Sequence, residues 1–117
     1  MATITVINEL GEADFAKTYR RTTVDNVRVG STQDGIRVVV GHNYQSANTY
    51  KEPHEFTGGL TEFTFRVGDR IYIGRYPFMT FNLALAEQSN DLFRITAVNK
   101  SYQLNGEVGQ WELQCAR

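Results

Sequence analysis

The chain has 117 residues, of which 41% are apolar and 12% aromatic, which excludes a disordered tail and predicts a single domain over residues 1–117. Twelve basic residues stand against thirteen acidic ones, so the basic surplus that is typical of nucleic-acid-binding proteins is missing. The one cysteine excludes an intramolecular disulfide, and no apolar run reaches the ~20 residues of a membrane-spanning helix.

The first third of the chain has the β-branched residues and the alternation of strands. Residues 3–7 are rich in β-branched side chains, so we expect a strand there. The N-terminus lacks a positively charged segment, so we expect no signal peptide. Further strands are expected over 18–29, where Tyr19 and Val27 share one parity, and over 35–40.

Residues 41–59 interrupt this pattern. The stretch is polar, begins and ends with glycine and contains one proline. Loops of this length without regular structure are functional or disordered. We therefore expect a long functional loop here.

Two further strands are expected over 60–67 and 70–74, separated by a tight turn at Gly68 and Asp69. The apolar segment 76–91 follows, and its residues "NLALAEQ" predict about two turns of helix. Either Thr80 or Asn82 is suited to cap that helix.

The last two strands, 92–102 and 110–116, are predicted to form a hairpin around the turn residues Asn105 and Gly106. Alternation places two sets of side chains on one core face: Phe93, Ile95 and Ala97, and Trp111, Leu113 and Cys115. Together these elements predict a mainly β fold, a small antiparallel β-barrel or sandwich with a long loop and one short helix.

The sequence offers no pattern for catalysis. His42 and His54 lie near Glu52 and Glu55, but their spacing matches no metal motif, so solvated loop residues are expected. Cys115 falls on the core face, which favours a structural thiol over a nucleophile. We predict no enzymatic activity, no metal and no cofactor.

Basic and aromatic residues alternate between Arg66 and Phe78, a pattern that suits either stacking on nucleic-acid bases or contact with a protein partner. The parity of the strands directs Arg66, Arg70 and Tyr72 away from the core. A third alternative, a sugar or small-molecule site, draws on Trp111 and the tyrosines, although Trp111 is expected in the core.

Five segments, 4–8, 18–29, 67–74, 93–98 and 111–116, have an order and spacing that resemble small virion proteins of tailed bacteriophages. The similar proteins belong to the head-to-tail connector region: neck, head-closure or stopper subunits. The motifs that carry the resemblance read "ITVIN", "TYRRTTVDNVRV", "VGDRIYIG", "FRITAV" and "WELQCA".

The resemblance implies a β-barrel subunit that assembles into a ring of about six or twelve copies. Such a ring joins the portal or adaptor of the head to the tail proteins, and the genomic DNA passes through it without sequence recognition. The protein would be made in the host bacterial cytoplasm and reside in the virion neck, with no membrane involved. Tail-terminator and minor capsid proteins are alternatives within the same group.

In this family long loops reach a neighbouring ring or the channel, and 41–59 holds that position here. The aromatic residues of the loop suit protein contact and its charged residues suit a wet surface. The predicted interaction residues are Tyr44, Tyr50, Lys51, Glu52, Phe56, Arg66, Arg70, Tyr72, Arg75, Tyr76 and Phe78.

Overall fold

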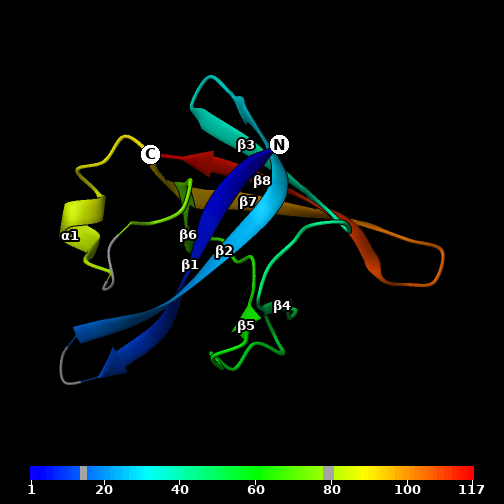
Figure 1. The fold of residues 1–117 in the computed structure, drawn as a ribbon, viewed down its shortest axis with the longest axis horizontal. Coiled ribbons are helices and arrows are strands. Elements are labelled where there is room, and N and C mark those ends of the chain that lie inside the picture. Colours follow the sequence, from blue (N-terminus) through cyan, green and yellow to red (C-terminus); the bar gives the residue numbers. More distant parts are fainter. Residues whose placement is uncertain (14–15, 78–80) are drawn as a thin grey trace.

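Six of the alternating segments pair edge to edge until the sheet closes on itself. The computed structural model describes residues 1–13, 16–77 and 81–117. The six strands are β1 (Ala2–Ala13), β2 (Ala16–Ser31), β3 (Gly35–Gly41), β6 (Arg70–Ile73), β7 (Leu92–Tyr102) and β8 (Val108–Ala116). They pair antiparallel in the order β1–β2–β3–β8–β7–β6 and form a closed barrel (Figure 1). The prediction of a mainly β fold with a small antiparallel barrel is confirmed.

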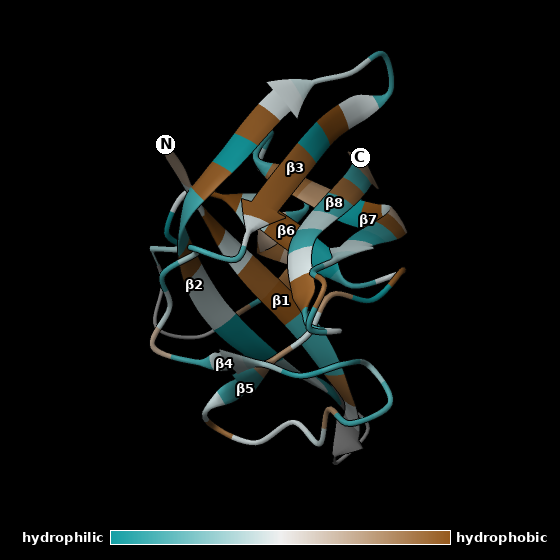
Figure 2. Ribbon diagram, turned by 90° about the vertical axis from the view of Figure 1, so that its right-hand side faces the viewer, coloured by the Kyte–Doolittle hydropathy of each residue, from teal (hydrophilic) through white to brown (hydrophobic). Residues whose placement is uncertain are grey.

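The barrel interior is filled by every second side chain of its strands. β-Branched and aliphatic residues dominate, as expected where alternate residues point inward. The apolar stretches of β1, β3 and β6 are visible as brown bands in Figure 2. The fully buried members from the barrel strands are Ile4, Val6, Val24, Val27, Val38, Val40, Ile71, Ile95 and Leu113.

The predicted strand over 60–67 is wrong. Only β5 (Glu62–Phe63) is a strand, and it pairs in parallel with β4 (Thr49–Tyr50) outside the barrel (Figure 2). The alternation of Phe63 and Phe65 nevertheless has a structural cause, because both rings insert into the main core and are at most 1% exposed. The turn at Gly68 therefore connects residues 60–67, which we call the covering segment, to β6, and does not join two barrel strands.

β-Bulges change the inward parity twice. In β2 the register slips between Val24 and Val27, where Asn26 adopts a φ of 67°, so both valines point inward. In β7 the register slips between Ile95 and Ala97. The prediction that Ala97 faces the core is therefore wrong, and Val98 packs against the core in its place.

The helix is shorter than predicted. α1 (Leu83–Ala86) has a single turn, capped by the side chain of Asn82, which accepts a hydrogen bond from the Leu85 N–H at 3.2 Å. The alternative cap, Thr80, lies outside the described residues. Among the helical residues that the structure describes, no segment is long and apolar enough to cross a membrane.

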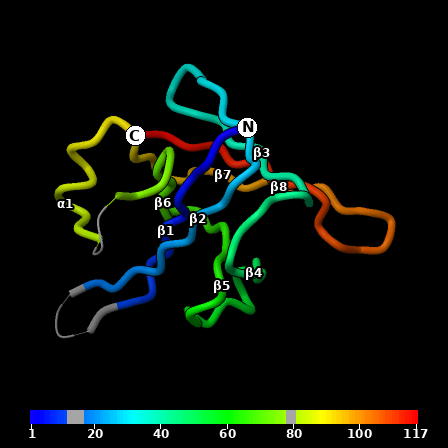
Figure 3. The backbone as a smooth tube through the Cα atoms, viewed as in Figure 1, coloured from blue at the N-terminus to red at the C-terminus, as the bar shows by residue number. Residues whose placement is uncertain are grey.

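Two hairpins extend beyond the barrel. One is the outer part of β1 and β2, and the other is the end of β7 and β8 around residues 102–108 (Figure 3). The second is a tight turn in which the Gln103 N–H donates to the Glu107 carbonyl at 2.7 Å and Gly106 has a φ of 87°. The turn predicted at Asn105 and Gly106 is confirmed.

Candidate interaction surfaces

Arg66 forms an ion pair with a buried carboxylate of the same chain. Its Nε lies 2.8 Å from Oδ2 of Asp69, which is 4% exposed, and its Nη2 donates to the Glu9 carbonyl at 2.6 Å. Asp69 also accepts a hydrogen bond from the Asn8 amide at 2.8 Å. The ring of Phe56 lies 5.3 Å from the Arg66 guanidinium. Two predicted interaction residues, Arg66 and Phe56, thus contact each other, and Arg66 joins the covering segment to β1.

Tyr44 and Tyr50 complete the aromatic core. The Tyr50 ring centroid lies 4.6 Å from that of Trp111, and the Tyr44 centroid lies 5.8 Å from Trp111 and from Phe63. Burial raises the pKa of the Tyr50 phenol above its ordinary value. Trp111 is only 4% exposed, so its face is covered by these rings and is not available for stacking on a sugar.

The loop 41–59 is tied to its surroundings at Lys51 and Glu52. The Lys51 N–H donates to the Phe63 carbonyl at 2.8 Å, and the Glu52 carboxylate forms an ion pair with Lys100 of β7. Partial burial is the largest single influence on the pKa of Lys100 and lowers it. The hydrogen bond to Glu52 and the electrostatic interactions with Tyr50, Glu52 and Tyr102 together outweigh the burial, so the net shift of the pKa is upward. The loop is therefore an ordered cover over one side of the barrel.

A cleft of about 590 Å³ opens between this loop and the end of the β7–β8 hairpin. Its walls include the half-buried Tyr44 and the exposed Tyr102, and three carboxylates, Glu52, Glu55 and Glu107, line it. No lysine or arginine is found among the described lining residues. The cleft is therefore acidic and aromatic, and we call it the acidic cleft.

Tyr72 and Tyr76 belong to a second apolar cluster on the outside of the barrel. Their ring centroids lie 5.2 Å apart, Tyr76 lies 5.4 Å from Phe81, and Phe81 lies 4.9 Å from Tyr19. Ile7, Ala86 and Leu92 form the buried part of this cluster. The two tyrosines therefore anchor the segment after β6 against β1 and β2.

Arg75 is exposed beside this cluster and lines a groove of about 380 Å³ together with Arg20 and Arg21. The Arg21 guanidinium lies 5.5 Å from the centroid of Tyr76. Phe78, the last predicted interaction residue, lies outside the described residues. The basic and aromatic residues that the structure describes from Arg66 to Tyr76 thus lie in separate surroundings and do not form one continuous stacking face.

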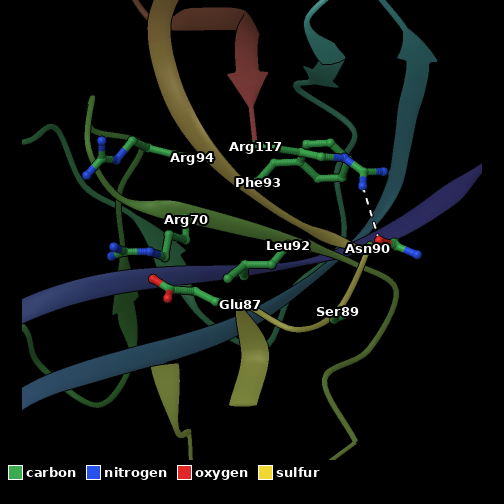
Figure 4. A pocket seen from close by; sticks show the side chains of 8 residues that line it. All are labelled: Arg70, Glu87, Ser89, Asn90, Leu92, Phe93, Arg94 and Arg117. Atoms are coloured by element: carbon green, nitrogen blue, oxygen red, sulfur yellow. Dashed lines mark hydrogen bonds between the residues drawn. The ribbon is translucent and has the colours of Figure 1, made fainter. Parts of the chain in front are cut away.

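Arg70 takes part in a cluster of three arginines. β6 and β7 place Arg70 directly opposite Arg94, and Arg117 lies at the same pocket of about 360 Å³ (Figure 4). Arg117 stacks 5.3 Å from the Phe93 centroid and donates to the Asn90 side chain at 3.2 Å. Neither Arg70 nor Arg94 forms an ion pair in the part of the chain that the structure describes. We call Arg70, Arg94 and Arg117 the arginine cluster.

Arg94 and Arg117 were not among the predicted interaction residues. Arg94 lies in β7 and Arg117 directly follows β8, and the sequence predicts both of these strands. Their proximity to Arg70 depends on the pairing of β6 with β7 and of β7 with β8. The sequence alone would indicate the cluster only if one assumed that the strand over 70–74 pairs with the strand over 92–102, which places Arg70 opposite Arg94.

The remaining candidate residues are the two histidines and Cys115. His42 borders the acidic cleft and His54 is exposed, and among the described residues no three potential metal ligands lie together. Cys115 is 4% exposed on β8, as predicted, and burial raises its pKa to about 12. Its thiol is therefore protonated at neutral pH and is a poor nucleophile.

Comparison of the chain with protein-family models, curated proteins and solved structures finds no match. Conclusions on function therefore rest on the sequence and on the geometry described above.

Proposed function

We propose that this chain is a non-enzymatic structural protein of a tailed-phage virion, a ring-forming subunit of the neck that joins the head to the tail. The proposal starts from the resemblance of its strand motifs to connector proteins. The closed barrel is compatible with it. The strands have no free edge where the barrel is closed, so association is left to the projecting hairpins, the loops and the charged surfaces.

The observation that supports the proposal most directly is the end of the β7–β8 hairpin. Tyr102 is 64% exposed and Leu104 is fully exposed at the tip, and neither residue belongs to an apolar cluster of the described chain. The turn that carries them is internally hydrogen-bonded. An ordered, projecting hairpin with an apolar tip is suited to insertion into a partner, because that contact removes the tip from water.

The first experiment is quantitative mass spectrometry of purified virions from the phage that encodes the chain, with heads and tails separated. We expect about six or twelve copies per particle in the head–neck fraction, the number of a closed ring. Recovery with the tail would favour the tail-terminator alternative, and a copy number that follows the capsid lattice would favour a minor capsid protein. Complete absence from particles would overturn the proposal.

A variant pair tests the role of the hairpin tip. Leu104→Asp should prevent incorporation into particles, because a carboxylate cannot be buried in an apolar contact without a partner. Val67→Asp is the matched control, since Val67 is 65% exposed at a turn outside the hairpin. Equal incorporation of both variants would show that the tip makes no contact in the virion.

A second candidate function is nucleic-acid binding, which the unpaired Arg70 and Arg94 favour. Binding to single-stranded DNA should then weaken steeply with salt and be lost in the Arg70→Ala/Arg94→Ala variant. The matched control is Arg28→Ala, an exposed arginine of β2 outside the cluster. Undetectable binding at low salt would eliminate this candidate.

A further inference from the structure

The arginine cluster is electrostatically unsatisfied within the described part of the chain. Arg70 and Arg94 are direct cross-strand neighbours, and like charges in this arrangement destabilise a sheet. Glu87 has the one carboxylate side chain among the described residues of the pocket, and Figure 4 shows it directed toward Arg70. Three guanidinium groups against one carboxylate side chain leave a surplus of two positive side-chain charges at this pocket.

The acidic cleft has the opposite character. Glu52 is neutralised by Lys100, whereas Glu55 and Glu107 form no ion pair within the described residues. The cleft therefore retains two unpaired carboxylates beside the rings of Tyr44 and Tyr102. Carboxylates next to aromatic faces are the surroundings that a guanidinium prefers, because it forms paired hydrogen bonds and stacks on rings.

The two surfaces lie on opposite sides of the molecule. The arginine cluster sits near β6, α1 and the C-terminus, and the acidic cleft lies between β4 and the far end of β7–β8 (Figure 1). These regions are separated along the longest axis of the molecule, which measures 44 Å (Figure 1). Within one chain the two surfaces cannot meet, but in two copies arranged head to tail they can.

We infer that the arginine cluster of one copy docks into the acidic cleft of the next copy. This contact joins two different surfaces, so it repeats from copy to copy and closes into a ring when the rotation permits. The inference rests on the proposed function, in which the chain forms a ring, and it identifies the surfaces that hold neighbouring subunits together. Arg94 and Arg117 are exposed and able to enter the cleft, where Glu55 and Glu107 receive them.

Charge exchange tests the inference on the purified full chain, with sedimentation velocity as the measurement of assembly. Arg94→Glu and Glu107→Arg should each raise the dissociation constant of the assembly at least about tenfold, because each brings like charges together at every contact. The chain that carries both substitutions should assemble nearly as well as the unmodified protein, since the ion pair is restored in reverse. The matched control is Arg28→Glu/Asp34→Arg, a charge exchange at two exposed positions outside both surfaces.

Thermal unfolding of the same variants separates association from folding. Arg94→Glu replaces a cross-strand repulsion with Arg70 by an attraction, so its unfolding midpoint should be unchanged or higher while its assembly is weaker. A variant that assembled poorly because it failed to fold would instead show a lower midpoint.

Two outcomes would overturn the inference. In the first, the unmodified chain assembles and neither single substitution affects it, which leaves the ring proposal intact and assigns the contact to other surfaces. In the second, the unmodified chain remains monomeric at millimolar concentration and low salt, where a charge-driven contact is strongest. The copy number in virions is measured independently, so failure of this contact and failure of the proposed function are distinguishable.

Discussion

Asn8 is the residue that connects the covering segment to the barrel. Its buried amide donates to the Thr64 carbonyl and to Asp69 at 2.8 Å each, and its carbonyl oxygen accepts from the Thr64 N–H at 3.2 Å. Asn8→Ala removes the partner of the Thr64 N–H and carbonyl and takes one hydrogen bond from Asp69, which keeps its ion pair with Arg66. The free energy of unfolding should therefore fall by about 2–4 kcal/mol. Chemical denaturation followed by circular dichroism measures the change.

The control for Asn8 is Asn99→Ala, at an exposed position of β7. It should change the free energy of unfolding by no more than about 0.5 kcal/mol. If the two substitutions have similar effects, the network around Asn8 does not stabilise the covering segment.

Cys115 gives a prediction for alkaline pH. Burial raises the pKa of its thiol from an ordinary value of 9.0 to about 12. Between these two values the unfolded chain loses a proton that the folded chain retains, so stability should decrease as pH rises through this range and is unaffected below it. Cys115→Ala should show a smaller decrease over the same range, measured by urea unfolding at each pH.

The same thiol should react slowly with a disulfide reagent at pH 8 in the folded protein and rapidly after denaturation. Fast reaction in the folded state would mean that the end of β8 opens readily.

At the scale of elements, strand β8 of the β7–β8 hairpin contributes Trp111 to the aromatic core. Trp111 contacts Tyr44, Tyr50 and Phe65 with ring centroids 4.6–5.8 Å apart. Trp111→Ala should therefore lower the free energy of unfolding by about 3–5 kcal/mol. The fluorescence of this single tryptophan should be blue-shifted in the native protein, and an emission maximum typical of full solvation would contradict its placement.

The turn of that hairpin requires a residue with positive φ. Gly106 has a φ of 87°, and a β-carbon added there would have no heavy atom within 4 Å beyond its chain neighbours, so any cost of substitution comes from the backbone. Gly106→Val should destabilise the protein by about 1–2 kcal/mol. Gly106→Asn should cost less, because asparagine tolerates this region, and equal costs would argue against the backbone explanation.

The covering segment illustrates why one element was misassigned. Residues 60–67 alternate as a half-buried strand does, and Phe63 and Phe65 are indeed buried. The alternation of apolar and polar residues indicates which side chains point inward, but it does not indicate which groups the backbone hydrogen-bonds to. Here the Thr64 backbone groups bond to the Asn8 side chain, so an extended segment exists without a place in the barrel.

For the whole molecule, closure of the barrel depends on pairings between distant parts of the chain. Ile4 pairs with Ile73, and Gly35 pairs with Ala116. Because loops of this length must close before these contacts form, folding should take about milliseconds to seconds. Stopped-flow refolding with Trp111 fluorescence measures the rate, and folding within microseconds would show that local structure dominates.

The sequence by itself determined the fold class, most of the barrel strands, a capped helix that begins near Thr80 or Asn82, the final hairpin and the burial of Cys115. These features depend on neighbouring residues, through alternation, turn preference and capping. Tertiary structure alone decided the bulge that packs Val98 instead of Ala97 against the core, the insertion of the covering segment, and the presence of Arg70, Arg94 and Arg117 at one pocket. Strand pairing produces each of these features, and pairing depends on residues far apart in the chain, which local patterns do not record.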